Sequence, residues 1–253
     1  MDTIYYDKLT LSLDKEYNTY YVTDCEKDAT IVTIPKQING IYVVGIGNNA
    51  FTECEKLEKV IFPEYDINDI INEQLFKEIG EHAFSYCISL KSILLPDTVC
   101  TILKGAFYQC KSLEEISFPS DAYVGPYAFY NCSSLKKVSN VSMVSEGVFG
   151  YCTSLKNLPI TNNVDEISED AFEHCDSLTK ITIPASINLI EGLAFRGCKN
   201  LTEVHFEDTA NWYWKNYYTN QNTPLNVSDP VKSANMLSKI DFDDGVRCWF
   251  KRL

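Results

Sequence analysis

The sequence predicts an α/β-type repeat solenoid, in which one chain of 253 residues winds into stacked coils around a continuous hydrophobic core. Two observations predict this fold. A phenylalanine with cysteine three residues later and leucine six residues later recurs along the chain, and each leucine opens an alternating apolar segment. Self-similarity at a period of about 23 residues is typical of repeat architectures. The phenylalanines of the seven copies are Phe51, Phe84, Phe107, Phe129, Phe149, Phe172 and Phe195.

The repeated unit matches at further positions as well. Alanine precedes the phenylalanine in every copy except the fifth, which has Val148, and an isoleucine or valine stands five residues before it. One unit exposes an apolar face and cannot fold alone, whereas stacked neighbours bury these faces together. We therefore expect a buried ladder of phenylalanine rings. The repeat cysteines are Cys54, Cys87, Cys110, Cys132, Cys152, Cys175 and Cys198, and the leucines are Leu57, Leu90, Leu113, Leu135, Leu155, Leu178 and Leu201.

Each leucine opens a short predicted strand that reads Leu-x-x-Ile-x-Ile or Leu-x-x-Ile-x-Phe and often ends at proline. In the first copy Val60 and Phe62 face the core and Ile61 faces outward, because side chains alternate along a strand. Pro63 follows at the strand end, where a missing N–H disturbs no ladder. The residues between the inward positions therefore form a solvent-facing sheet surface.

The period, the strand pattern and the Ala-Phe-x-x-Cys segment together resemble the BspA-like class of leucine-rich repeats, over residues 29–206. The resemblance implies a right-handed, curved horseshoe with a parallel β-sheet on its concave side. Short helical, 3-10 or extended segments would lie on the convex side. Proteins of this class occur mostly on microbial surfaces or are secreted, and several act as adhesins or bind host matrix. The resemblance thus implies a binding module more strongly than any particular ligand.

A solenoid needs a cap at each end. Residues 1–35 are expected to form a β-rich N-terminal cap, with a hairpin turning near 16–18, that leads into the first strand. Residues 36–206 hold the repeats, and residues 207–253 are expected to form a C-terminal cap with an aromatic excursion. A final strand is expected at Leu237, Ile240 and Phe242.

Two intervals depart from the period. An insertion near 64–73 is expected to form a short convex-side helix that runs toward Phe76. The interval between Phe129 and Phe149 is three residues short, and Asn140 stands where other strands have isoleucine or phenylalanine. Such irregularities mark either a functional loop or ordinary drift of a repeat.

Composition and charge narrow the range of partners and locations that we expect for the protein. The formal net charge of −13 repels phosphate groups, so nucleic acid and anionic membrane are not expected as partners. No apolar stretch reaches the roughly 20 residues of a membrane span, and residues 1–7 resemble no secretory leader. We expect either a surface protein whose leader was removed or, as the alternative, a cytoplasmic protein.

The ten cysteines invite functional interpretations. Zinc sites use cysteine pairs two to four residues apart, which do not occur here, and stacked repeats present parallel rather than facing cysteine side chains. The repeat cysteines are therefore expected to be buried free thiols, whereas Cys25, Cys100 and Cys248 stay open. The three histidines fall in different repeats, so we expect no catalytic site, no metal and no cofactor.

Recognition is expected instead on the concave strand face, where a protein or peptide ligand would bind. A second candidate is an aromatic segment that could contact carbohydrate or, alternatively, pack as part of the C-terminal cap. An intracellular interaction scaffold is the competing hypothesis. The candidate strand-face residues are Lys59, Ile61, Ser92, Leu94, Glu115, Ser117, Lys137, Ser139, Lys180, Thr182, Glu203 and His205, and the aromatic ones are Trp212, Tyr213, Trp214, Tyr217 and Tyr218.

Overall fold

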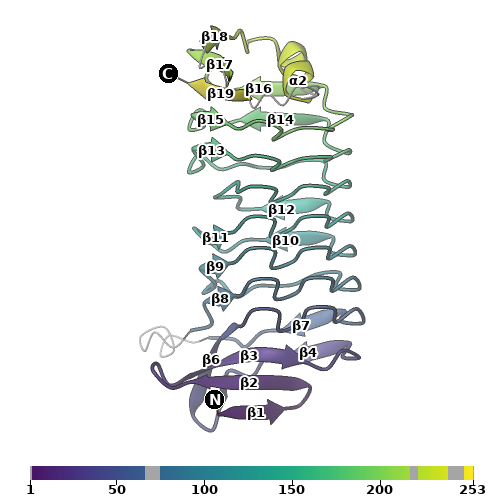
Figure 1. Cartoon of the computed structure of the whole chain (residues 1–253), viewed down its shortest axis with the longest axis vertical. Coiled ribbons are helices and arrows are strands. Elements are labelled where there is room, and N and C mark those ends of the chain that lie inside the picture. Colours follow the sequence, from purple (N-terminus) through teal and green to yellow (C-terminus); the bar gives the residue numbers. More distant parts are fainter. Residues whose placement is uncertain (1, 66–74, 217–221, 239–247, 253) are drawn as a thin grey trace.

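The computed structural model describes residues 2–65, 75–216, 222–238 and 248–252. It is a β-solenoid of about eight turns with parallel strand pairing, which confirms the predicted repeat solenoid, and it contains very little helix. The coils stack along the long axis, the N-terminal strands cover one end, and the last strands cover the other (Figure 1). The core runs through the middle of the coils as one continuous cluster.

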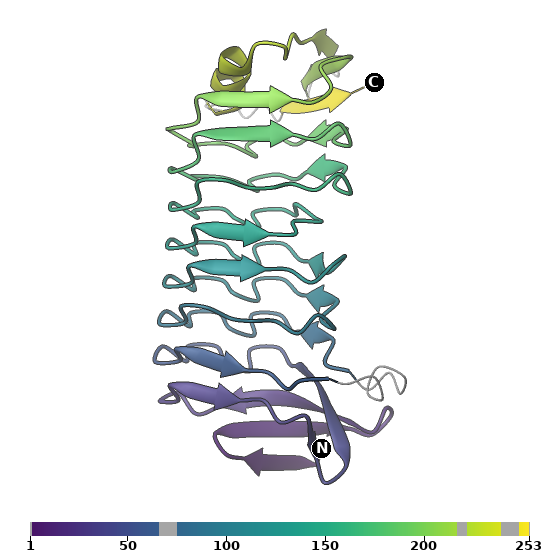
Figure 2. The ribbon, with the colours of Figure 1, turned by 180° about the vertical axis from the view of Figure 1, so that it is seen from behind.

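One side of most coils carries the strand that follows the repeat leucine. β4 (Ile31–Thr33) pairs with β7 (Lys59–Ile61), β10 (Glu115–Ser117) with β12 (Lys137–Ser139), and β14 (Lys180–Ile183) with β16 (Glu203–Phe206), always in parallel. A parallel bridge from Ser92 to Glu115 joins the coil before β10 to this strand. The strands lie above one another when the molecule is seen from behind (Figure 2). We call their outward side the long-strand face.

A second ladder of shorter strands runs along another side of the coils. β6 (Ile41–Ile46), β8 (Glu78–Ile79), β9 (Thr101–Ile102) and β11 (Tyr123–Val124) pair in parallel, as do β13 (Glu166–Ile167) and β15 (Leu189–Ile190). These strands hold the isoleucine or valine that precedes every repeat phenylalanine except Phe149, and those side chains are buried. Of the conformations expected here, the extended one is realised. We call this side the short-strand face.

The Ala-Phe-x-x-Cys segments form turns between the two ladders. The alanine, phenylalanine, cysteine and leucine of each unit are buried. Neighbouring phenylalanine rings stack, with centroids 4.8 Å apart for Phe51 and Phe84 and 5.0 Å for Phe107 and Phe129. All seven repeat cysteines are buried free thiols, which confirms that expectation.

The N-terminal end is closed by antiparallel strands. β1 (Thr3–Tyr6), β2 (Leu9–Asp14) and β3 (Thr19–Cys25) pair in sequence, and the expected hairpin lies between β2 and β3. β3 then pairs in parallel with β6, which also pairs with β5 (Gln37–Ile38). The cap therefore continues directly into the short-strand ladder. The helix expected in the insertion near 64–73 falls on residues 66–74, outside the described residues.

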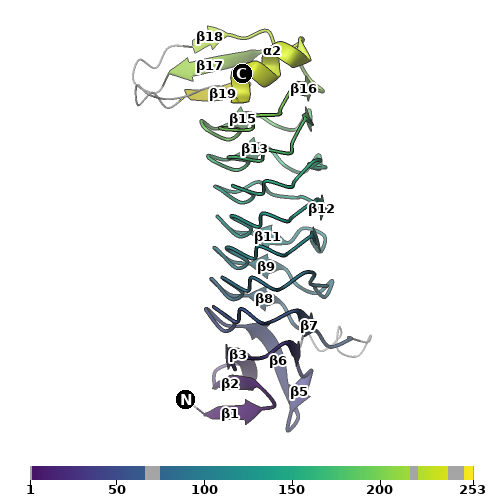
Figure 3. The same ribbon diagram turned by 90° about the vertical axis from the view of Figure 1, so that its right-hand side faces the viewer.

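The C-terminal end is closed by a small sheet and a helix (Figure 3). β17 (Trp212–Asn216), β18 (Asn222–Pro224) and β19 (Cys248–Arg252) are antiparallel, and β19 also pairs with β15. α2 (Pro230–Ser238) packs against β16.

The expectation of a strand starting at Leu237 is wrong. Leu237 lies in α2, where it is buried with Ser233 and Ala234, one helical turn away. Asp229 caps this helix by accepting hydrogen bonds from the N–H groups of Val231 and Lys232 at 3.1 Å. Ile240 and Phe242, the other two positions of the expected strand, lie outside the described residues.

Candidate functional site

The coil that contains Phe149, residues 141–160, has no strand on either face. Before it, Asn140 adopts φ +58° and donates a side-chain hydrogen bond to the carbonyl oxygen of Phe118 at 3.0 Å, which ends β12. Pro159 then occupies the place of a strand residue without an N–H to donate. Within residues 141–160, all of which are described, a single isolated parallel β-bridge joins Val141 to Ile160. The three-residue deletion noted in the sequence thus interrupts both ladders at one level.

A groove of about 690 Å³ opens on the long-strand face at this interruption, between β12 and β14. Its floor includes Leu158 and Pro159 of the Phe149 coil. We call it the long-strand groove. Half of the candidate strand-face residues line it, namely Lys137, Ser139, Lys180, Thr182, Glu203 and His205.

Charge in the long-strand groove is mixed, although the protein as a whole is acidic. Lys136 contributes an ammonium group that is paired with Glu114 at 2.9 Å. Lys180 and Glu203 are register partners on β14 and β16, and His205 Nε2 lies 3.1 Å from Glu203 Oε2. The groove therefore offers both donors and acceptors to a polar ligand.

A smaller groove of about 260 Å³ lies beside it, over β10 and β12. Ser92, Leu94, Glu115 and Ser117 line it, together with Lys137 and Ser139. Leu94 is 84% exposed, the highest value among the exposed large apolar side chains of the described residues. Lys59 and Ile61 lie outside both grooves, on the exposed side of β7. Ten of the twelve candidate residues are thus brought to two adjoining grooves.

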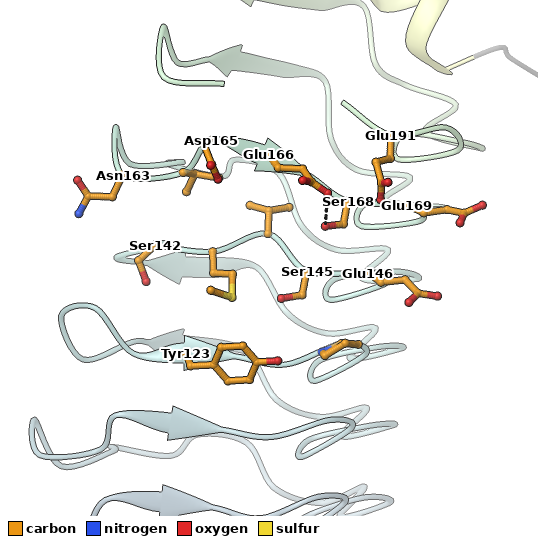
Figure 4. A pocket seen from close by; sticks show the side chains of 14 residues that line it. Tyr123, Ser142, Ser145, Glu146, Asn163, Asp165, Glu166, Ser168, Glu169 and Glu191 are labelled. Carbon is orange, nitrogen blue, oxygen red and sulfur yellow. Dashed lines mark hydrogen bonds between the residues drawn. The ribbon is translucent and has the colours of Figure 1, made fainter. Parts of the chain in front are cut away.

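The short-strand face has a groove of its own at the same level, about 700 Å³ in volume (Figure 4). It is lined by carboxylates, and Tyr123 and Met143 contribute apolar surface. We call it the carboxylate groove. Its acidic residues are Glu146, Asp165, Glu166, Glu169 and Glu191.

Two serines replace backbone donors where the short-strand ladder stops. Ser145 Oγ donates to the carbonyl oxygen of Val124 at 2.5 Å, and Ser142 Oγ donates to that of Ala122 at 3.3 Å. Burial, and then the charge of Glu191, raise the pKa of Glu166.

The sequence analysis did not predict the carboxylate groove. The short interval between Phe129 and Phe149 was the available signal, but a deletion alone does not say on which face of the solenoid a groove forms.

Of the candidate aromatic residues, the structure describes the side chains of Trp212 and Tyr213. Trp212 is 2% exposed, its ring centroid lies 4.9 Å from that of Phe206, and its Nε1 donates to the carbonyl oxygen of Asp208 at 2.9 Å. This packing corresponds to the cap alternative. Tyr213 is half-buried on β17, the Trp214 side chain is not described, and Tyr217 and Tyr218 lie outside the described residues.

Two kinds of feature are absent from the described part of the chain. No group of three or more histidine, cysteine, aspartate or glutamate side chains is placed to hold a metal ion. Among the helices described, none is both long enough and apolar enough to cross a membrane.

Comparison with known proteins gives a consistent result. The family model for the BspA type leucine rich repeat region matches six copies, over residues 46–142 and 139–229. No curated protein sequence matches. The leucine rich repeat protein of T. pallidum is 27% identical, with 81% of this chain and 84% of that one covered and a TM-score of 0.52.

Two further solved structures are more distant. A leucine-rich repeat protein from Bacteroides capillosus is 24% identical, with 54% of this chain and 96% of that one covered and a TM-score of 0.46. Another from Eubacterium ventriosum is 23% identical, with 69% of this chain and 54% of that one covered and a TM-score of 0.48.

Proposed function

The chain belongs to the BspA-type leucine-rich repeat family, and we propose that it is a non-enzymatic binding module that recognises a protein ligand through its long-strand face. The family is a scaffold for protein interaction, and the finer assignment to one face is our own. One observation carries it. The interruption of the ladder at the Phe149 coil coincides with a groove on the face where ten candidate side chains line two adjoining depressions.

The shape and chemistry of this face favour an extended polypeptide as the ligand. Both grooves are lined by residues of several neighbouring coils, which suits a segment with several side chains better than one small molecule. Leu94 offers an apolar contact, and Lys137 and Lys180 offer cationic ones. The positive charges of these two lysines, on a protein that is acidic as a whole, favour the encounter and orientation of a ligand that carries carboxylates.

A peptide-display selection on the immobilised full chain tests this proposal. Selected peptides should bind the wild type and lose at least tenfold in affinity to the double variant Lys137→Glu/Lys180→Glu. The matched control is Lys56→Glu/Lys111→Glu, which reverses two exposed charges on the turns between the ladders. Equal binding to both double variants, with circular dichroism showing both folded, would remove the long-strand face from consideration.

We further propose that the protein works at the cell surface or outside the cell. The support is the resemblance to repeat proteins that are found there, and the scaffold hypothesis is the intracellular alternative. Protease treatment of intact cells should degrade the protein while a cytoplasmic marker survives. Full protection until the cells are lysed would favour the scaffold.

A further inference from the structure

The junction between the N-terminal cap and the first coil places two cysteines together. In the later coils, each repeat thiol donates to the carbonyl oxygen of the phenylalanine one coil earlier, as Cys87 does to Phe51 at 3.1 Å. Cys54 belongs to the first unit, so there is no earlier coil whose phenylalanine carbonyl it could reach. Its Sγ instead lies 4.0 Å from the carbonyl oxygen of Cys25, the last residue of β3. Cys25 thus stands where the preceding coil would have its phenylalanine.

The two thiols also lie close together. Both residues are buried, and each thiol donates to a backbone carbonyl oxygen at the junction, Cys25 to that of Glu26 at 3.6 Å and Cys54 to that of Cys25 at 4.0 Å. The Nζ of Lys27 donates to the carbonyl oxygen of Thr52 at 2.6 Å. The proximity of the two thiols and the charge of Lys27 lower the pKa of Cys54, while the same proximity and burial raise the pKa of Cys25. Cys54 is therefore the better nucleophile of the pair.

The other repeat thiols are in a different situation. Each of the six from Cys87 to Cys198 donates to a backbone carbonyl oxygen, and burial raises the pKa of each. Cys100 is exposed, and its Sγ lies 3.6 Å from the carbonyl oxygen of Lys77. Among the nine cysteines whose side chains are described, only Cys54 has its thiol hydrogen-bonded to the backbone of another cysteine.

We propose that Cys25 and Cys54 are a disulfide-forming pair that links the N-terminal cap covalently to the first coil. The oxidant is a small disulfide such as oxidised glutathione. The Cys54 thiolate attacks one of its sulfurs, forming a mixed disulfide and releasing one glutathione thiolate. Cys25 then loses its proton and attacks the Cys54 sulfur, and the second glutathione leaves. Two protein thiols are oxidised, and one disulfide is reduced to two thiols.

Both sulfurs are covered in the folded protein, so exchange takes place as the cap docks during folding or when the junction opens. Once formed, the bond is shielded from reductants by the same burial. It ties β1, β2 and β3 to the solenoid and restricts the unfolded chain between residues 25 and 54. The pairing of β3 with β6 also joins the cap to the coils.

Refolding the full chain in a glutathione redox buffer tests the pair. Free thiols are then blocked under denaturing conditions and the chain is mapped by mass spectrometry. We expect a linked peptide that contains Cys25 and Cys54, and a fall in free thiols from ten to eight. We also expect a higher melting temperature than that of the reduced protein. A full complement of ten free thiols, or a different linked pair, would overturn the proposal.

Two variants separate this cross-link from general oxidation. Cys25→Ala should show no linked peptide at Cys54 and no rise in melting temperature on oxidation. Cys110→Ala removes a thiol from the middle of the ladder and should keep both the linked peptide and the rise. If the oxidised Cys25→Ala protein gained as much stability as the wild type, the cross-link would not be the cause. This outcome is independent of ligand binding at the long-strand face.

Discussion

The Cys110 thiol donates a hydrogen bond of 3.1 Å to the carbonyl oxygen of Phe84, one coil earlier. The same contact links each later repeat cysteine to the phenylalanine before it. The cysteine therefore does more than fill space, because its thiol gives a buried carbonyl of the neighbouring coil a second donor, beside the N–H of that coil's own cysteine. The other pairs are Cys87 with Phe51, Cys132 with Phe107, Cys152 with Phe129, Cys175 with Phe149, and Cys198 with Phe172.

Removing one ladder thiol should destabilise the fold moderately. Cys132→Ala leaves a small cavity and loses a weak hydrogen bond, so we expect the free energy of unfolding to fall by about 1–2 kcal/mol. Cys100→Ala is the control, because Cys100 is exposed, and its effect should stay within about 0.5 kcal/mol. Urea unfolding followed by circular dichroism measures both. Equal effects at the two positions would contradict a role for the buried thiols.

Removing one ring of the phenylalanine ladder should cost more. Phe107 is fully buried and stacks between Phe84 at 5.1 Å and Phe129 at 5.0 Å. Phe107→Ala should therefore lower the free energy of unfolding by about 3–5 kcal/mol. Tyr5→Ala, at a residue that is 83% exposed, should leave the melting temperature nearly unchanged. An unchanged melting temperature for Phe107→Ala would show that the ring is not core.

Glycine at position 105 makes room for a ring from the coil before it. A Cβ added to Gly105 would lie 2.4 Å from Cε1 of His82, and the residue has φ +62°. Gly40 has φ +79°, but nothing lies within 4 Å of an added Cβ. Gly40→Ala should thus cost only backbone strain, about 1 kcal/mol. Gly105→Ala should lower the free energy of unfolding by more than this. The additional loss of stability should vanish when His82→Ala is combined with it. Persistence of the loss in the double variant would argue against the ring contact.

The stability of the solenoid should depend on pH through Asp170. Burial, and then the charge of Glu173, raise the pKa of Asp170 from 3.8 to about 6. The folded state therefore binds this proton more tightly than the unfolded state, and stability falls as pH rises from about 4 to about 6. Asp170→Asn should remove this dependence and stabilise the protein by about 1–2 kcal/mol at pH 7.5. Chemical unfolding across that pH range measures it, and a less stable variant at pH 7.5 would contradict the sign.

Local repetition explains why so much of the fold could be predicted. The spacing of Phe107, Cys110 and Leu113 recurs in each unit, and only stacking buries all three, so the core positions follow from the pattern. The short-strand ladder was harder to predict. Each strand, such as Thr101–Ile102, has two residues, and its extended backbone is held by the neighbouring coils rather than by its own sequence.

The grooves depend on what a deletion does in three dimensions. The short interval before Phe149 was visible in the sequence. The loss of strand pairing on both faces, however, involves Asn140, Pro159 and the two serines whose hydroxyls replace backbone donors. Leu237 was misassigned because a three-position apolar pattern over six residues fits a strand as well as a helix end. The capping contacts of Asp229 decide it in favour of the helix.

Site-specific photocrosslinking tests the central functional claim most directly. A benzoylphenylalanine placed at Thr182, exposed beside the long-strand groove, should crosslink to a display-selected peptide. The same group placed at Glu146, beside the carboxylate groove, should not. Crosslinking at Thr182 that is competed by excess unlabelled peptide is the result we predict. Crosslinking at Glu146 with none at Thr182 would contradict recognition through the long-strand face.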